Sequence, residues 1–239
     1  MRPVARAMVL SAALAALMGT PLAAWAAEGP PAAAPAAAAA AAPAEAGKLP
    51  GLGPQTRSLI PDRTRQVLLV SGSADSAQST VSLYQRGPSG WQRTAGPWTA
   101  HNGLRGWTHA HELNDLRSPY GVYGLTDAGG WLPDPGTKLP YRGNADFKTD
   151  RVFAGKPMTD SFGYVIAINY NRVQGRSPMD NAKPLGTAKG GGIWLHVDAD
   201  APTQGCVSIS RGAMRRVLRT LNPAAHPVIV MGDRTSLAA

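Results

Sequence analysis

The chain has 239 residues, of which 44% are hydrophobic, and a formal net charge of +9. Its positively charged residues are scattered along the sequence and form no basic stripe, so the composition does not favour nucleic acid as a partner. A basic protein outside the cytoplasm would instead meet the anionic polymers of the cell envelope.

The first residues have the pattern of a secretory signal peptide. Arg2 and Arg6 precede an apolar stretch over residues 8–18, and small residues flank a cleavage position after Ala26. The apolar stretch is shorter than the roughly 20 residues that a membrane span needs. We therefore expect residues 1–26 to be a signal peptide, the mature form to have no transmembrane span, and the protein to be exported to the periplasm or cell envelope. A signal retained as an N-terminal anchor is the alternative.

The segment that follows has the composition of a linker. Residues 27–46 are almost entirely Ala and Pro, and the repeated prolines remove backbone donors and interrupt helices. We expect a disordered Ala/Pro linker over residues 27–60 and one catalytic domain, acting as a monomer, over residues 61–239. That length is sufficient for a domain with its own hydrophobic core.

Short apolar or alternating segments separated by Gly and Pro predict a mostly β (β-rich α+β) domain. A turn signal over residues 87–90 predicts a hairpin over residues 80–93. Near the end, Ser210 can cap a helix whose apolar residues recur at three- and four-residue spacing until Asn222 and Pro223 stop it. The expected strands cover residues 66–70, 80–84, 120–125, 164–170, 193–197, 206–209 and 228–231.

The strand over residues 193–197 and the one that begins at Cys206 carry the chemistry. Strand alternation places His196 and Trp194 on one face and the aliphatic residues on the other. Because the two strands are joined by a short, turn-rich segment, we expect them to be neighbours and the imidazole to come within reach of the thiol. The imidazole can then take the thiol proton, since only the thiolate attacks a carbonyl well.

Cys206 is the single cysteine of the chain. In an oxidising compartment a lone thiol cannot form an internal disulfide, which indicates a reactive group, an intermolecular bridge or an accident. Gly205 allows a sharp turn that could point the N–H groups around Gln204 at one spot, as an oxyanion hole requires. Thr203 could orient either partner through its hydroxyl. A buried structural cysteine beside an unrelated histidine is the alternative.

These residues resemble a known family. The run Ile193-Trp194-Leu195-His196 followed by Thr203-Gln204-Gly205-Cys206-Val207 is similar to the catalytic segment of L,D-transpeptidase (YkuD-type) domains, in which an apolar strand ends in His before a Ser/Thr-x-Gly-Cys-apolar signature. Residues 118–123, 164–171 and 227–232 resemble further strands of that family. The resemblance covers most of the chain from about residue 65 to 233, and implies a mixed β-sheet sandwich or barrel with at least one packed C-terminal helix.

The resemblance also implies a reaction on peptidoglycan stem peptides. Cys206 would attack the carbonyl between positions three and four, D-alanine would leave, and an amine of a second stem would resolve the thioester into a 3-3 cross-link. His196 would act as base and then as acid, with Gly205, Gln204 and Thr203 in supporting positions. No cofactor and no metal is needed, and a carbapenem is expected to acylate the thiol.

The sequence departs from the family pattern around this motif. The usual signature often has His at the position of Gln204, Arg or Asn at that of Ser208, and Gly or Ser at that of Val197, with a longer loop before the cysteine. Arg172, Arg176 and Lys189 are the candidates to replace the missing arginine as a carboxylate partner. The residues expected to line the substrate site are Tyr164, Asn169, Trp194 and Ser208.

Three other functions compete with transpeptidation. Water could resolve the same thioester, which would make the protein an L,D-carboxypeptidase or endopeptidase. A zinc hydrolase could use His109 and His111 together with His196 and Cys206, although His101, His109 and His111 are better explained as loop or cleft residues. The third alternative is a non-catalytic module that binds the envelope. We read Asp198 and Asp200 as a solvated turn.

Overall fold

We describe the fold from a computed structural model that covers residues 47–239. The expected signal peptide and the Ala/Pro run lie outside the described residues. Residues 47–60, which composition assigns to the linker, contain helix α1 (Pro54–Ser58) and the buried side chains of Leu49 and Leu52. These two leucines pack against the main body, so this part of the segment contributes to its core.

The described chain is mostly β, as the sequence predicts. The strands are β1 (Gln66–Gly72), β2 (Gln78–Gly87), β3 (Gly90–His101), β4 (Trp107–Thr108), β5 (Ser118–Pro119), β6 (Gly121–Gly130), β7 (Tyr141–Gly143), β8 (Val152–Phe153), β9 (Lys156–Pro157), β10 (Val165–Ile168), β11 (Trp194–Val197), β12 (Val207–Ile209) and β13 (Val228–Asp233). The helices are α1, α2 (Arg211–Thr220), α3 (Arg234–Leu237) and the short 3₁₀ turns η1 (Ala145–Phe147), η2 (Thr187–Lys189) and η3 (Pro223–Ala225). Each strand that the sequence predicts has a counterpart, and β2 and β3 form the predicted hairpin.

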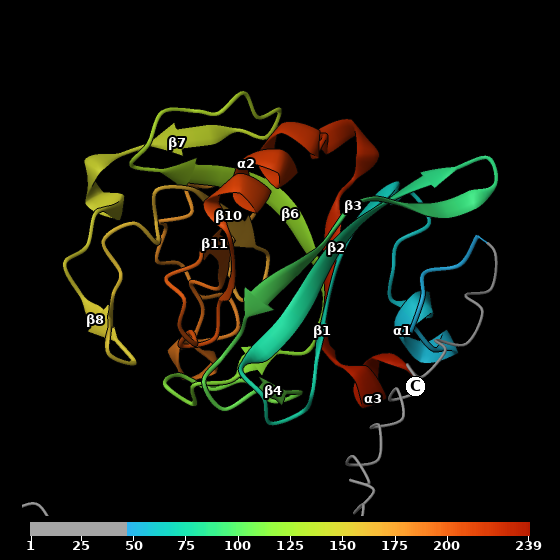
Figure 1. Cartoon of the computed structure of the whole chain (residues 1–239), viewed down its shortest axis with the longest axis horizontal. Coiled ribbons are helices and arrows are strands. Elements are labelled where there is room, and N and C mark those ends of the chain that lie inside the picture. Colours follow the sequence, from blue (N-terminus) through green and yellow to red (C-terminus); the bar gives the residue numbers. More distant parts are fainter. Residues whose placement is uncertain (1–46) are drawn as a thin grey trace, which may run out of the picture. The chain divides into compact units, whose positions relative to one another are not determined.

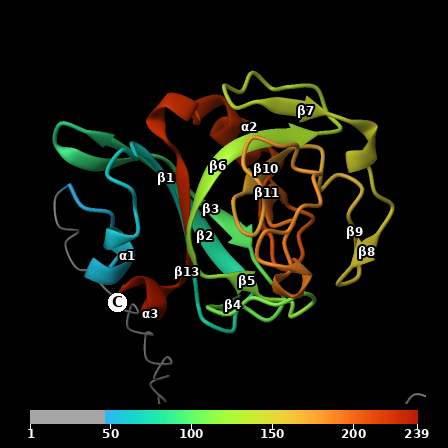
Figure 2. The ribbon, with the colours of Figure 1, turned by 180° about the vertical axis from the view of Figure 1, so that it is seen from behind.

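Eight of the strands close into a barrel. The main sheet has the order β10-β11-β12-β3-β2-β1-β13-β6-β7, and β6 pairs with β10 as well as with β13, which closes the ring. The two pairs β1–β13 and β11–β12 are parallel, whereas the other neighbours around the ring are antiparallel. The helices α1 and α3 lie beside β1 and β13, at the opposite end of the described domain from β8 and β9 (Figures 1 and 2).

One face of the strands, together with α2, forms the main hydrophobic core. Met214, Val217 and Leu218 of α2 are buried in it. Ser210 caps the helix by accepting a hydrogen bond from the amide of Ala213, which confirms the predicted start of this helix. The strand residues of this core include Leu68, Val81, Ile166, Leu195, Val197, Val207, Ile209 and Ile229.

The opposite face of β1 and β13 is covered by the two ends of the described chain. We call this second hydrophobic group the outer cluster. The amide of Gly53, just before α1, donates to the carbonyl of Leu237 in α3 at 2.8 Å, which ties these ends together. The outer cluster consists of Leu49, Leu52, Val67, Leu69, Tyr84, Val228, Val230 and Leu237.

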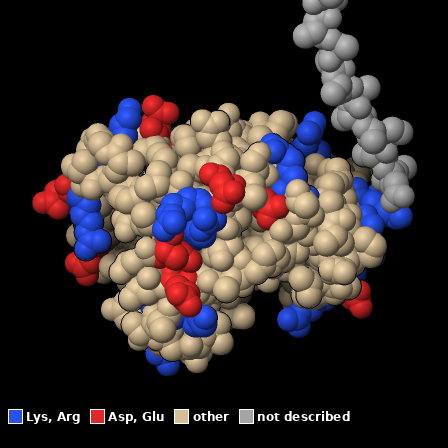
Figure 3. Space-filling view, turned by 90° about the horizontal axis from the view of Figure 1, so that it is seen from below, with Lys and Arg blue, Asp and Glu red and all other residues tan. Residues whose placement is uncertain are grey.

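Charged side chains of both signs are interspersed over the face shown in Figure 3, between larger uncharged areas. This agrees with the scattered positive residues of the sequence. Among the residues that the structure describes, no helix is both long and apolar enough to span a membrane.

Candidate active site

The parallel pairing of β11 and β12 brings the two predicted catalytic residues to one face of the sheet. The register pairs Leu195 with Val207 and His196 with Ser208. Because side chains alternate along a strand, Cys206 and His196 both lie on the face opposite the main core. They are two residue positions apart in the strand register. The sequence argument that these strands are neighbours is therefore confirmed.

The thiol of Cys206 lies against the backbone that precedes β11. Its sulfur accepts the backbone N–H of Trp194 at 3.4 Å and lies 3.7 Å from the carbonyl oxygen of Gly192. The side chain is half-buried. Burial raises the pKa of the Cys206 thiol to about 11, and the N–H of Trp194 opposes that rise. The thiol is therefore protonated at neutral pH in the free protein.

The imidazole of His196 is held by its own strand. Its Nδ1 lies 2.8 Å from the carbonyl oxygen of Val197. A carbonyl only accepts hydrogen bonds, so Nδ1 carries the proton and Nε2 has the free lone pair of a base. The ring of Phe162 packs edge-on against it at 5.2 Å. His196 is 2% exposed, and burial lowers its pKa to about 4.

The thiol of Cys206 and the imidazole of His196 are consequently both neutral at physiological pH. Within residues 47–239 no hydrogen bond joins the two side chains directly. A thiol pKa of about 11 beside an imidazole pKa of about 4 disfavours a resting ion pair. Any use of this thiol as a nucleophile would therefore require its proton to be removed during the reaction.

Hydroxyl groups hold the turn before Cys206 in place. Gly205 has φ +140°, and a Cβ there would come within 3.0–3.4 Å of Arg117, Ile193 and His111. The amide of Gly205 donates to the hydroxyl of Thr203 at 3.2 Å, and that hydroxyl donates to the carbonyl of Cys206 at 2.6 Å. Since this amide is engaged, the backbone N–H groups of Gln204 and Cys206 are the better candidates for an oxyanion site.

A polar cluster that the sequence did not predict lies beside the pair. Ser208 donates to the carboxylate of Asp198 at 3.0 Å, and Nδ1 of His101 in β3 lies 3.0 Å from the same carboxylate. The interpretation of Asp198 and Asp200 as a solvated turn is thus wrong for Asp198, although it is correct for Asp200, whose side chain is 88% exposed. Ser208 and His101 face each other across paired strands that are far apart in the sequence, which is why no local pattern indicated their shared contact with Asp198.

A cavity of about 340 Å³ is lined by Trp194, whose backbone N–H contacts the thiol, but neither Cys206 nor His196 lines it. The rings of Phe147 and Phe162 pack against the Trp194 indole at 5.8 and 5.2 Å. Charged groups of both signs border this aromatic wall. The residues that line the cavity are Asp146, Phe147, Lys148, Thr149, Asp150, Arg151, Phe162, Met179 and Trp194.

Two of the predicted substrate-site residues lie elsewhere. Tyr164 packs in the main core, and Asn169 accepts a hydrogen bond from Arg172 at 2.6 Å; neither lines the cavity beside Trp194. Arg172 is itself buried in an ion pair with Asp127 at 2.9 Å, so it is not available to hold a substrate carboxylate.

The remaining two basic residues named as substitutes for the missing arginine are more accessible. Arg176 pairs with Asp180 at 3.3 Å, and Lys189 pairs with Glu112 at 3.8 Å. Neither lines the cavity beside Trp194. Within that cavity, Lys148 and Arg151 are the positively charged groups, and the sequence argument named neither of them.

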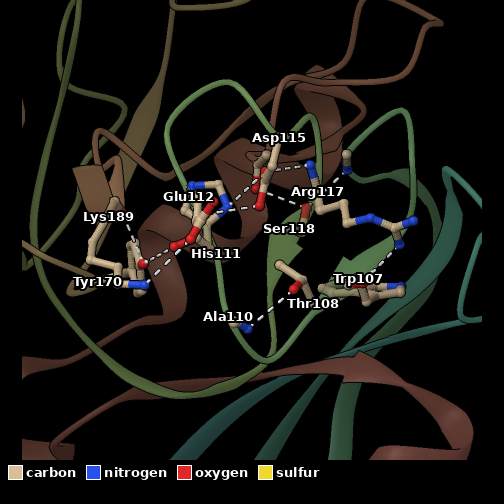
Figure 4. Close-up of polar contacts among 12 residues, drawn as sticks. Trp107, Thr108, Ala110, His111, Glu112, Asp115, Arg117, Ser118, Tyr170 and Lys189 are labelled. Atoms are coloured by element: carbon tan, nitrogen blue, oxygen red, sulfur yellow. Dashed lines mark hydrogen bonds and ion pairs between the residues drawn. The ribbon is translucent and has the colours of Figure 1, made fainter. Parts of the chain in front are cut away.

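The histidines proposed as zinc ligands have separate partners. His109 packs on Tyr120 with ring centroids 4.2 Å apart, and its Nε2 lies 3.1 Å from the hydroxyl of Ser236. His111 is buried, with Nδ1 3.0 Å from Asp115 (Figure 4), and burial lowers its pKa while Asp115 opposes that change. In the part of the chain that the structure describes, no three His, Cys, Asp or Glu side chains are grouped as a metal site would require.

Comparisons with known proteins add no relative. Neither a scan against protein-family models nor searches of curated proteins and of solved structures found a match for this chain.

Proposed function

We propose that this chain is an exported L,D-transpeptidase that cross-links peptidoglycan stem peptides through a thioester on Cys206. One observation carries the proposal. The single thiol of the chain and a buried imidazole lie on the same face of two adjacent parallel strands, with a free Nε2 lone pair on the imidazole. Nucleophilic catalysis by cysteine needs a base within reach of the thiol, and placement on one face of adjacent strands brings the imidazole to the same side of the sheet as the thiol.

In the first half of the proposed reaction, Sγ of Cys206 attacks the carbonyl carbon of residue three of the donor stem. Nε2 of His196 takes the thiol proton, and the carbonyl oxygen becomes an oxyanion that backbone N–H groups at the nucleophile turn can stabilise. The C–N bond then breaks, and His196 returns the proton to the amine of the departing D-alanine. The product is a thioester on Cys206.

In the second half, an amine of another stem attacks the thioester carbonyl. His196 takes a proton from that amine and returns it to the sulfur when the C–S bond breaks, which restores the thiol. Both half-reactions use a neutral His196 as base, and a His196 pKa of about 4 favours that neutral form at physiological pH.

The cavity beside Trp194 supports a peptide as substrate. Its aromatic wall can pack against the aliphatic part of a diamino acid, while Lys148 and Arg151 attract carboxylates and Asp146 and Asp150 attract an amine. A stem peptide carries both kinds of charge, so the mixed border matches its chemistry. Cys206 does not itself line the cavity, and Trp194, whose backbone N–H contacts the sulfur, is the residue that the two share.

The test is incubation of the purified mature protein with a disaccharide-tetrapeptide, followed by mass spectrometry of the products. Cross-linked dimers with loss of D-alanine are expected, and Cys206→Ser should form neither dimers nor a covalent adduct with a carbapenem. Tripeptide without dimers would identify the hydrolase instead. No product and no adduct from the wild-type protein would refute a thioester enzyme.

A chelator addresses the zinc alternative in the same assay. Because the proposed mechanism uses no metal, product formation should be unchanged after treatment with a chelator and removal of the chelated metal. Loss of activity that zinc restores would contradict the cysteine mechanism.

A further inference from the structure

A buried serine from a distant part of the sequence contacts the backbone on which the nucleophile sits. Ser118, in β5, is fully buried. Its hydroxyl lies 2.8 Å from the carbonyl oxygen of Gly205 and 3.2 Å from that of Cys206, and the single hydroxyl proton is shared between them. The same hydroxyl accepts the amide of Gly103 at 2.9 Å. The only hydrogen that this hydroxyl can donate is therefore directed at the turn over residues 203–206, which we call the nucleophile turn.

The segment that carries Ser118 is itself braced. The carboxylate of Asp115 accepts the amides of Glu112 and Arg117 at 2.9 and 2.8 Å, and it also contacts His111 (Figure 4). The guanidinium of Arg117 donates to the carbonyl of Trp107 at 3.1 Å. These contacts fix the backbone on both sides of the loop that ends at Ser118. The hydroxyl of Ser118 is consequently held in one position, from which it can orient the nucleophile turn.

Two hydroxyl groups donate hydrogen bonds to the carbonyl of Cys206. Thr203 donates to it from within the turn at 2.6 Å, and Ser118 approaches it from β5. The orientation of this peptide group sets the backbone angles of Cys206, and these angles decide whether Sγ lies against the amide of Trp194. A buried carbonyl that loses a donor also has to find another, so the turn would rearrange.

We propose that Ser118 is a positioning residue for the nucleophile, which keeps the sulfur of Cys206 in its reactive orientation by holding the carbonyls of Gly205 and Cys206. The proposal rests on the proposed function for its effect on acyl transfer. It does not depend on that function for its effect on the thiol itself.

The experiment compares Ser118→Ala and Ser118→Thr with the wild-type protein, with Ser79→Ala as the matched control. Ser79 is also a buried serine, but its hydroxyl has no hydrogen-bond partner among residues 47–239, and it lies in β2, two strands away from β12. We expect Ser118→Ala to lower kcat for carbapenem acylation about tenfold, the effect of one lost hydrogen bond, while KM changes less than twofold. Ser118→Thr should restore most of the rate, and Ser79→Ala should match the wild type.

Alkylation of Cys206 by iodoacetamide at pH 8 separates this proposal from the proposed function. Ser118→Ala should react more slowly, because the sulfur loses its contact with the Trp194 amide that favours the thiolate. If wild-type protein forms no acyl-enzyme, the proposed function fails, and the alkylation comparison still decides the role of Ser118. The role of Ser118 would be overturned if folded Ser118→Ala had the same alkylation rate and the same acylation rate as the wild-type protein. If Ser118→Ala does not fold, a folded Ser118→Thr with a tenfold lower kcat would overturn it as well.

Discussion

The surroundings of Cys206 and His196, the proposed nucleophile region, and the outer cluster lie on different strands of the same barrel. The first is held by polar contacts and the second by apolar ones. Around Cys206 and His196, the buried side chains of His196 and Ser118 and the partly exposed carboxylate of Asp198 each have a specific partner. The outer cluster consists of apolar side chains between β1, β13 and the two short helices, apart from the hydroxyl of Tyr84. In the first region, each buried polar group that lacks a hydrogen-bond partner would lower the free energy of unfolding. The outer cluster stabilises the fold through the burial of apolar surface alone.

This contrast teaches that activity and stability should be separable by mutation. Changes to the hydrogen-bonded groups should alter the chemistry of Cys206 more than the free energy of unfolding. Changes to the outer cluster should do the reverse, because β1 and β13 are far around the ring from β11.

The largest effect should come from His196→Gln. Glutamine is neutral and polar, so it can still occupy the buried position beside Val197, but it cannot act as a base. We expect the rate of carbapenem acylation to fall about 10²- to 10⁴-fold, as for loss of a general base. Stopped-flow absorbance of the carbapenem measures this rate. A decrease smaller than tenfold in a folded variant would exclude His196 as the base.

Leu237→Ala tests the other side of the comparison. This leucine is 1% exposed in the outer cluster, and its truncation leaves a cavity beside β13. We expect the free energy of unfolding to fall by about 2–5 kcal/mol, with the acylation rate per folded molecule unchanged. Urea unfolding followed by tryptophan fluorescence gives the first quantity. A lower acylation rate in the folded variant would show that the two regions are coupled.

Acid should destabilise the protein through His196. Its pKa is lowered from 6.5 in the unfolded chain to about 4 in the folded protein, so the unfolded state binds more protons between these values. The contribution of the neutral His196 to the free energy of unfolding is fully present above the unfolded pKa. It is lost as the pH falls toward 4, which lowers the free energy of unfolding by about 3 kcal/mol. Urea unfolding at pH 7 and at pH 4 measures the difference. His196→Gln serves as the control and should lose about that much of the pH dependence.

The smallest effect should follow Asp198→Asn. The negative charge of Asp198 raises the pKa of His196 and holds both His101 and Ser208. Its removal should lower acylation about three- to tenfold and move the acidic limb of the pH–rate profile to lower pH. Asp200→Asn, at an exposed carboxylate, should behave as the wild type. Equal profiles for the two variants would mean that Asp198 has no influence on the site.

Much of the fold was predictable because it depends on local patterns. Alternating apolar residues identified the strands of the barrel, and the Ser210 cap identified α2, since each of these signals acts over a few neighbouring residues. The placement of His196 away from the aliphatic core followed from strand alternation in the same way. The parallel pairing of β11 with β12 could not be inferred, because so short a connection is typical of antiparallel neighbours.

The sequence by itself determined which groups could react, because a thiol, an imidazole and a flexible glycine are properties of single residues. Only the tertiary structure decided their surroundings. The hydroxyl of Ser118 reaches Gly205 across 87 positions of the sequence, and His101 reaches Asp198 across 97. Burial, which depends on the whole fold, sets the pKa values of Cys206 and His196. Such contacts join residues whose proximity is created by closure of the barrel, and no local spacing encodes them.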